Sequence, residues 1–361
     1  LLGVIFHSIA SFPFYMRKDW LVGDSQQSVV LDVQFYVLHV FRMQAFFLVA
    51  GFFAHQLYHR QGRQGFVQNR LRRILLPFLV FMPLMQLVNF LVRIWIQHRS
   101  QVGGATRLYW QLVHSEGADW RWFTENYSLQ HLWFLWFLVL FYGIVLVVRP
   151  IVVRVDPYEQ MRQQIDLRVA RVMEKWWGAL GLTLLIVTPM AFMKGGLGVD
   201  WPFNLVPEPA PFVLYGVFFT LGWFFHRQTG LIDLFRMYWR INATIALVLI
   251  TAMTVVFISV AHAVVDSSPA KVVDKQVLIL IVVTLNVLYA FASMTAVFAF
   301  IGGIITLFSR PSRRVRYLAD ASYWMYLIHL FVVLLIQTAI APYNWPWPVK
   351  VLLILTGTLS V

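Results

Sequence analysis

The chain contains ten apolar runs, most of them close to the roughly 20 residues that a helix needs to cross a bilayer. A water-soluble domain with 60% hydrophobic and only 12% charged residues would expose large apolar patches. The sequence therefore predicts an all-α fold, a polytopic transmembrane bundle of about ten helices. The predicted spans are approximately residues 1–15, 31–58, 74–96, 131–148, 177–195, 210–226, 241–262, 276–308, 320–341 and 347–361.

The first and last runs are shorter than a full span. The chain begins without Met at Leu1 and stops at Val361, in each case inside an apolar run. We therefore expect both terminal helices to be clipped. No composition shift marks a soluble domain, so residues 1–361 are expected to form a single membrane-integral domain.

The basic residues predict the orientation of the chain. The net charge is +13, but the Lys and Arg residues stand in short blocks between apolar runs, which favours orientation signals over nucleic-acid binding. Alternate connections carry 18 and 9 of them, and the richer set is expected to face the cytoplasm together with both chain ends. That set comprises residues 59–73, 149–176, 227–240 and 309–319.

Two segments differ from a simple membrane span or a short connecting turn. Residues 276–308 form a run of 33 residues that contains Gly302 and Gly303, so a tilted helix, a broken helix and a re-entrant piece all remain open. Residues 156–178 alternate charged and apolar groups at helical spacing. They predict an amphipathic helix on the cytoplasmic membrane surface.

His39 and Arg42 stand three residues apart inside an apolar run. Ionisable groups are costly there, so they mark a candidate functional site. Residues three or four apart share a helix face, and Asp32 and Tyr36 continue the same stripe. His39 and Arg42 are therefore expected to face the protein interior or a wet cavity. A polar contact between helices is the alternative.

Two further histidines lie within predicted spans. Neutral His7, in the first span, could take a proton from an alcohol near neutral pH. Ser322, Tyr326 and His329 form one polar stripe on the penultimate span. For His7 a structural role, and for His329 a hydrogen-bonded seam between helices, are the alternatives. No Asp or Glu lies well within a span, which counts against ion-coupled transport and glycoside hydrolysis.

A basic cluster follows the second span. Arg70 and Arg73 are expected to share a helix face, where paired guanidinium groups suit phosphate groups, although the positive-inside rule alone would explain them. His55 and His59 have the spacing of helical metal ligands, but no acidic third ligand is near. The chain has no cysteine, so thiolate catalysis and Cys-based metal sites are excluded. We expect no bound metal.

Five groups of short motifs occur in order along the chain: Leu1–His7, His39–Gln44 with Phe46–Phe47 and Ala50–Phe52, Arg70–Arg73 with Pro77, His131–Leu135 and Ala321–His329. Together they resemble the membrane-integral acyltransferase 3 family, and within it the glucans biosynthesis protein C group. The ordered set covers nearly the whole chain. Ala50 departs from the family, which usually has a serine before the glycine at Gly51.

This resemblance implies a ten-helix enzyme of the bacterial inner membrane with no permanently bound cofactor. It would move an acyl group, succinyl or acetyl, from cytosolic acyl-CoA to a periplasmic glucan or another extracytoplasmic carbohydrate. His7 would be the general base or acyl relay. Arg70 and Arg73, with Arg72 between them, would contact coenzyme A. His131 and Trp133 become candidate substrate-binding residues.

The chemistry of acyl transfer is compatible with these residue types. A thioester acyl transfer needs a base for the acceptor hydroxyl and donors for the developing oxyanion. His7 could be the base, Arg42, His39 or Tyr326 could be donors, and His329 is a further catalytic candidate. A glycan or lipid-linked-sugar transporter or flippase is the main rival. In a third hypothesis, a membrane scaffold, the intramembrane charges would have no explanation.

Overall fold

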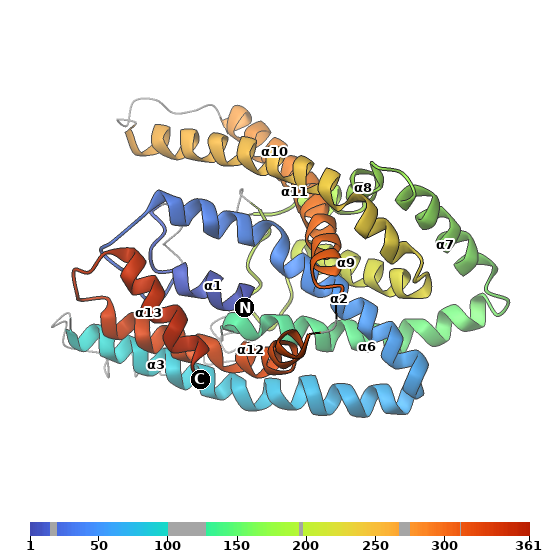
Figure 1. Ribbon diagram of the computed structural model, residues 1–361, viewed down its shortest axis with the longest axis horizontal. Coiled ribbons are helices and arrows are strands. Elements are labelled where there is room, and N and C mark those ends of the chain that lie inside the picture. Colours follow the sequence, from blue (N-terminus) through green and yellow to red (C-terminus); the bar gives the residue numbers. More distant parts are fainter. Residues whose placement is uncertain (15–19, 100–127, 195–197, 267–274, 311) are drawn as a thin grey trace.

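The computed structural model describes residues 1–14, 20–99, 128–194, 198–266, 275–310 and 312–361 (Figure 1). Every regular element within these residues is a helix. In chain order they are α1 (Leu2–Ile9), α2 (Val29–Arg70), the π-helix η2 (Leu71–Leu75), α3 (Leu76–Arg99), the 3-10 helix η3 (Gln130–Leu132), α6 (Trp133–Val155), α7 (Gln160–Met173), α8 (Gly178–Ala191), α9 (Pro209–Arg227), α10 (Leu231–Asp266), α11 (Lys275–Leu307), α12 (Arg313–Ile340) and α13 (Trp347–Leu359).

Each of the ten predicted runs contains a helix, and the chain is a polytopic helical membrane protein. The longest membrane-compatible segment, Val29–Ile96, contains two of the predicted spans. Three other runs correspond to the shorter apolar helices α1, α8 and α13. Among the described residues, six segments are long and apolar enough to cross a membrane: Val29–Ile96, Gln130–Val155, Pro209–Arg227, Leu231–Val256, Ile279–Leu307 and Arg313–Ile340.

The connection predicted at 59–73 is helical on both sides of one residue. Gly62 has φ 66° and ψ −175°, a conformation that is essentially restricted to glycine. At this position the chain turns back, so the part of α2 before Gly62 and the part that continues through η2 into α3 meet at a corner (Figure 1). The connection predicted at 227–240 is likewise shorter in the structure, because α9 ends at Arg227 and α10 begins at Leu231. Long basic side chains at helix ends can reach water, so charge alone did not mark where these helices end.

The long run at 276–308 is one continuous helix, α11. Gly302 does not break it. A Cβ atom built on Gly302 would lie 2.2 Å from the backbone oxygen of Phe235, on α10. The glycine therefore permits close backbone packing between α10 and α11, and the broken and re-entrant alternatives are wrong.

The helix α7 lies inside the predicted amphipathic segment 156–178. Asp156 precedes it and accepts hydrogen bonds from the backbone N–H groups of Met161 and Arg162, at 3.2 and 3.0 Å. These bonds satisfy donors of the first turn of the helix. In Figure 1 α7, the Gly62 corner and the connection from α9 to α10 lie at the same end of the molecule. The location of α7 on the membrane surface stays a prediction.

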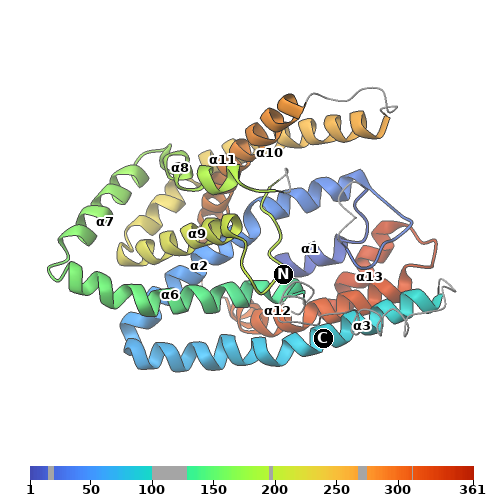
Figure 2. The same cartoon turned by 180° about the vertical axis from the view of Figure 1, so that it is seen from behind.

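The helix α2 runs between two groups of helices (Figures 1 and 2). On one side it contacts α9 and α11, which pack with α8 and α10. On the other side α1 contacts α12 and α13, and α12 also contacts α3. The N-terminal half of α2 thus faces α1, which brings the polar stripe of α2 near His7.

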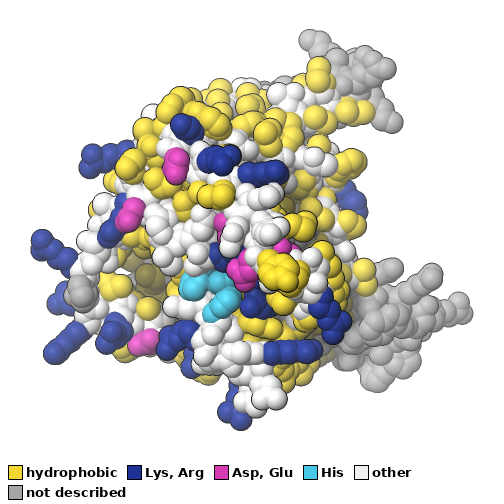
Figure 3. All heavy atoms as spheres, turned by 90° about the vertical axis from the view of Figure 1, so that its right-hand side faces the viewer, with side chains coloured by type: hydrophobic (Ala, Val, Ile, Leu, Met, Phe, Trp, Pro, Cys, Tyr) yellow, Lys and Arg dark blue, Asp and Glu magenta, His cyan; other side chains and the backbone are white. Residues whose placement is uncertain are grey.

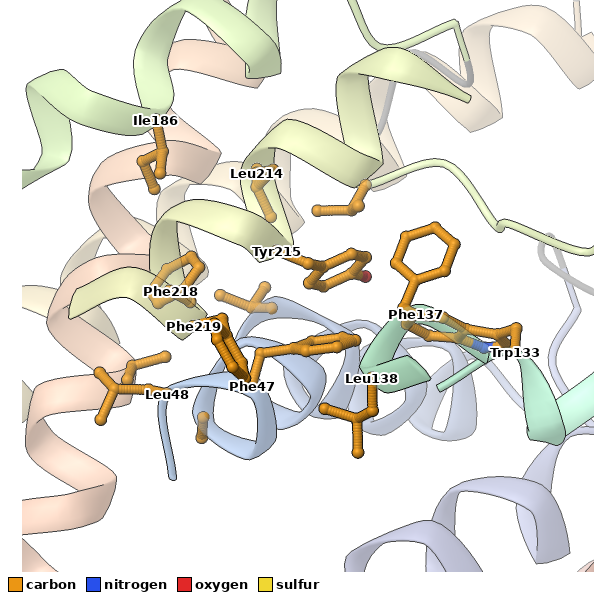
Figure 4. Close-up of a cluster of buried hydrophobic side chains, with 14 of the residues drawn as sticks. Phe47, Leu48, Trp133, Phe137, Leu138, Ile186, Leu214, Tyr215, Phe218 and Phe219 are labelled. Atoms are coloured by element: carbon orange, nitrogen blue, oxygen red, sulfur yellow. The ribbon is translucent and has the colours of Figure 1, made fainter. Parts of the chain in front are cut away.

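A cluster of aromatic side chains holds α2, α6 and α9 together (Figure 4). The Phe47 ring centroid lies 4.7 Å from that of Tyr215 and 5.5 Å from that of Phe141. Trp133 lies 5.1 Å from Tyr215 and is 7% exposed. Aromatic rings at such separations contribute beyond the burial of their area. This packing fixes the middle of α2.

A buried ion pair joins α13 to the segment before α2. Lys350 Nζ lies 2.7 Å from Asp24 Oδ2, and the two side chains are 0% and 2% exposed. We expect Lys350→Met to cost about 3 kcal/mol or more, because it leaves the Asp24 carboxylate buried without its cation.

Thermal unfolding in detergent measures this effect. Asp24→Asn combined with Lys350→Met should be less destabilising than the two single substitutions added together, because neither charge then remains alone. Strictly additive effects would contradict a stabilising pair.

Candidate active site

The polar stripe of α2 faces the protein interior, as its spacing predicted. Asp32, Tyr36 and Arg42 are buried, and His39 is partly buried. The Asp32 carboxylate accepts a hydrogen bond from the backbone N–H of Phe14 at 2.7 Å. The stripe therefore joins α2 to the segment that follows α1.

Three histidines from distant parts of the chain meet beside this stripe. The ring centroids of His7 and His329 are 5.2 Å apart, and those of His131 and His329 are 5.0 Å apart. All three side chains are buried. Tyr326 joins them from α12, with its hydroxyl donating to the His131 backbone oxygen at 2.7 Å. The structure thus brings together four of the predicted site residues from α1, η3 and α12.

Hydrogen bonds to the backbone fix two of the imidazole tautomers. His329 Nδ1 lies 2.8 Å from the Tyr326 oxygen and 3.0 Å from the Met325 oxygen. Since a carbonyl only accepts, Nδ1 carries the proton and the Nε2 of the neutral ring has the lone pair. His131 is reversed, because its Nε2 lies 3.3 Å from the Leu327 oxygen. The lone-pair atoms, His329 Nε2 and His131 Nδ1, are buried without a partner among the described residues.

Arg42 places a positive charge next to the histidines. Its guanidinium carbon lies 3.7 Å from the centroid of the Phe6 ring, which the His7 ring contacts edge-on at 5.2 Å. The atoms Nε and Nη1 are buried and donate to no described group. No ion pair joins Arg42 to a carboxylate in the described part of the chain. These N–H groups are therefore available to an oxygen that develops negative charge.

His39 lies at the edge of the cluster, held by a residue that the sequence did not indicate. The Tyr289 hydroxyl donates to the His39 backbone oxygen at 3.0 Å, and His39 Nδ1 lies 3.0 Å from the same hydroxyl. A hydroxyl has one proton, so it must accept from Nδ1–H of His39. Trp201, in the segment before α9, lies 4.9 Å from the His39 ring. Tyr289 positions the imidazole and Trp201 covers it.

Gln337 and Trp20 support His7. The amide of Gln337 donates to the His7 backbone oxygen at 2.9 Å, and its oxygen accepts from Trp20 Nε1, also at 2.9 Å. The Trp20 ring stacks on the His7 ring with centroids 5.4 Å apart. His7 Nδ1 has no partner among the described residues. The backbone of His7 is thus fixed while one ring nitrogen stays unpaired.

A sequence signal for some of these missed residues exists in retrospect. Gln337 lies eight residues after His329 and continues the polar stripe of α12 by two turns. Tyr289 lies three residues after Asn286, one of the few polar groups within a span. Trp20 and Trp201 lie outside regular helices, so no periodicity marked them.

The basic cluster lies apart from the histidines. Arg42 precedes the Gly62 corner by 20 residues and Arg70 follows it by 8. At 1.5 Å per residue these distances along the helices are about 30 and 12 Å. Arg70 stacks on Tyr142 at 4.6 Å, whereas Arg72 and Arg73 are exposed within the π-helix η2. Arg70 is therefore closer to the corner than Arg42 is, by about 18 Å of helix length.

Three other residues that the sequence singled out, Trp133, His55 and His59, lie outside the histidine cluster. Trp133 belongs to the aromatic packing of Figure 4 rather than to the histidine cluster. His55 and His59 lie together, with ring centroids 4.2 Å apart. Within the described residues no group of three or more His, Cys, Asp or Glu residues is arranged to hold a metal ion.

The cluster contains the groups that base-assisted acyl transfer requires. Unpaired imidazole nitrogens can accept a proton, and the Arg42 N–H groups can stabilise an oxyanion in a site from which water is largely excluded. The Tyr326 hydroxyl is already engaged with the His131 backbone. Arg42 is therefore the better oxyanion donor of these two candidates.

Comparison with known proteins agrees with this chemistry. The model of the acyltransferase 3 family, described as an acyltransferase domain, matches residues 1–361. Proteins named "Glucans biosynthesis protein C" from Escherichia coli strains SMS-3-5 and K12 are each 27% identical over 147 residues, which is 39% of this chain and 33% of the relative. The match thus covers a third of these relatives. No solved structure matches the chain. The chain belongs to the acyltransferase 3 family.

Proposed function

We propose that the protein is a membrane O-acyltransferase that moves an acyl group from acyl-CoA to a hydroxyl of an extracytoplasmic carbohydrate. The observation that carries the proposal is the convergence of His7, His131 and His329 beside Arg42, whose guanidinium has no carboxylate partner among the described residues. Membership of the acyltransferase 3 family supports the same activity.

In the proposed reaction His7 removes the proton of the acceptor hydroxyl as its oxygen attacks the thioester carbonyl carbon. The carbonyl oxygen becomes an oxyanion, which the Arg42 N–H groups stabilise. The C–S bond then breaks, and the leaving thiolate takes the proton from the His7 imidazolium. The products are an ester and the free thiol of coenzyme A. His329 and His131, with lone pairs facing no described partner, assist this proton transfer.

The donor and the acceptor are proposed to approach from opposite sides of the bilayer. Arg70, Arg72 and Arg73 lie toward the Gly62 corner, at the end expected to face the cytoplasm, where they could bind the phosphate groups of coenzyme A. A glucan acceptor and a succinyl group are favoured by the resemblance to glucans biosynthesis protein C, and an acetyl group is the alternative. The location is then the bacterial inner membrane, with both chain ends cytoplasmic.

The test is acceptor-dependent release of coenzyme A thiol by the purified protein in detergent. Succinyl-CoA and acetyl-CoA are compared, each with and without a periplasmic glucan. We expect one donor to be consumed faster when the glucan is present, with an acylated glucan detected by mass spectrometry. If neither donor binds or is consumed while glycan enters vesicles that contain the protein, the acyltransferase proposal is wrong and the transporter hypothesis replaces it.

A further inference from the structure

A second group of histidines lies near the Gly62 corner, apart from the candidate active site. His55 and His59 project from α2, and His226 from the last turn of α9. The Nδ1 atoms of His55 and His226 are 2.8 Å apart, and their ring centroids are 4.9 Å apart. The reaction proposed above uses none of these residues.

The short contact between two ring nitrogens restricts the protons that the pair can hold. At 2.8 Å one Nδ1 must donate and the other must accept. The accepting ring then has a proton on Nε2, and the donating ring has a free lone pair there. One more proton can bind to that lone pair without breaking the contact, whereas a second would break it. The pair can therefore become a monocation next to an anion.

Arg149 adds a permanent positive charge. Its guanidinium carbon lies 4.4 Å from the centroid of the Tyr58 ring, and it interacts electrostatically with His55 and His59. No carboxylate pairs with it in the described part of the chain. Arg227, by contrast, is paired with Asp166 at 2.8 Å.

Two acidic residues near these histidines, Glu159 and Asp156, are already paired. Glu159 is the carboxylate that interacts with His59, and it lies 3.2 Å from Arg162. The same arginine contacts Asp156 at 3.3 Å. Arg149 and the three imidazoles therefore remain as a local excess of cationic and N–H groups.

This group can be reached from the surface. His55 is the most buried of the four residues, with 5% of its surface exposed. His59 is exposed, and His226 and Arg149 are partly exposed. Figure 3 shows this end of the molecule, with histidine side chains among Lys and Arg and a hollow in the surface beside them. A ligand group can thus approach without passing through the bundle.

We propose that His55, His59, His226 and Arg149 form a binding site for a phosphate group. Phosphate offers several oxygen acceptors and up to two negative charges, which match one guanidinium and imidazoles that can take up one proton. A carboxylate would use fewer of these donors. The phosphate could belong to a nucleotide ligand or to the headgroup of an anionic lipid.

The neighbourhood of Arg70 favours the nucleotide. Arg149 stacks on Tyr58 and Arg70 lies 5.4 Å from the Phe66 ring, and these two rings are 5.5 Å apart. The two guanidinium groups thus flank one aromatic patch and could hold separate phosphate groups of one molecule of coenzyme A. This nucleotide branch rests on the proposed function; the lipid branch does not.

The experiment uses the full chain in nanodiscs of zwitterionic phosphatidylcholine. Calorimetric titration measures the binding of coenzyme A, of dephospho-coenzyme A, which lacks the 3′-phosphate, and of inorganic phosphate. Arg149→Gln and His226→Gln are compared with Arg154→Gln, an exposed arginine near the end of the same helix α6. Thermal unfolding checks that each variant is folded. In a second arm, phosphatidylglycerol replaces part of the lipid, and the shift in unfolding temperature is measured.

If the phosphate belongs to the nucleotide, the wild type binds coenzyme A about tenfold more tightly than dephospho-coenzyme A, since charge-assisted hydrogen bonds are lost without the phosphate. Arg149→Gln and His226→Gln remove this difference, and Arg154→Gln retains it. The ligand is a lipid headgroup if the wild type binds coenzyme A and dephospho-coenzyme A equally well, and phosphatidylglycerol raises the unfolding temperature of the wild type but not that of Arg149→Gln.

Folded Arg149→Gln and His226→Gln proteins that respond to coenzyme A, phosphate and phosphatidylglycerol as the wild type does would overturn the inference. A wild type that binds phosphate through these residues but releases thiol from no acyl-CoA would leave the phosphate site standing. That result would reject the proposed function alone.

Discussion

Replacing His7 by alanine should lower acceptor-dependent release of coenzyme A by at least about a hundredfold, since a positioned general base contributes about 10²–10⁴ in rate. The His7 ring contacts both the Trp20 ring and the His329 ring, and its Nδ1 has no described partner. Initial rates of thiol release under saturating donor and acceptor measure the loss. Binding of the donor should change little, because the basic cluster is distant.

The control for this prediction is Ser8→Ala, on the same helix and also buried. It should retain most of the activity and the unfolding temperature of the wild type. His329→Asn tests the role of the His329 Nε2 lone pair. The asparagine amide can still donate to the Met325 and Tyr326 carbonyls, as Nδ1–H does, but it has no atom equivalent to Nε2. A folded His7→Ala protein with more than about a tenth of the wild-type rate would exclude His7 as the base.

Enlarging the glycines where α2 and α9 touch should prevent correct folding. A Cβ atom on Gly222 would lie 1.8 Å from the Leu48 backbone oxygen, and one on Gly51 would lie 1.9 Å from that of Phe219. Because these contacts are with backbone atoms, neither helix can relieve the clash by a rotamer change. Gly222→Ala should therefore cost about 3 kcal/mol or more, and Gly51→Ala with Gly222→Ala should give no folded protein.

Size-exclusion profiles and thermal unfolding in detergent test this second prediction. Gly143→Ala on α6 is the matched control, because a Cβ atom there meets nothing within 4 Å. It should behave as the wild type, or gain slightly from the better helix propensity of alanine. Equal unfolding temperatures for Gly222→Ala and Gly143→Ala would show that α2 and α9 do not pack as described.

The sequence predicted features that depend on local spacing. The apolar runs located the helices, and the i, i+3 relation placed Arg42 on a buried face with Asp32 and Tyr36. Tyr326 and His329 likewise share a stripe of α12 that faces the other histidines. Ser322, predicted on the same stripe, is exposed instead. Each of these inferences uses only the geometry of one helix, which residues close in sequence determine.

The boundaries of the helices were less predictable. Polar residues at 59–73 predicted a connection, but helix continues through them except at Gly62. Outside an apolar environment, basic residues such as Arg60 and Arg63 are compatible with helix as well as with a loop. Only the backbone conformation of Gly62 shows where the chain reverses.

The amino-acid sequence by itself determined that this chain is a membrane bundle of helices, with isolated His and Arg residues inside it, because hydrophobicity and helical periodicity are local properties. Only the tertiary structure decided that His7, His131 and His329 meet, that Tyr289 holds His39 from 250 residues away, and that His226 joins His55. Those contacts depend on which helices pack together and how closely. Close packing is possible where glycines such as Gly51 and Gly222 let backbones touch, and no periodicity in one helix specifies the partner that it meets.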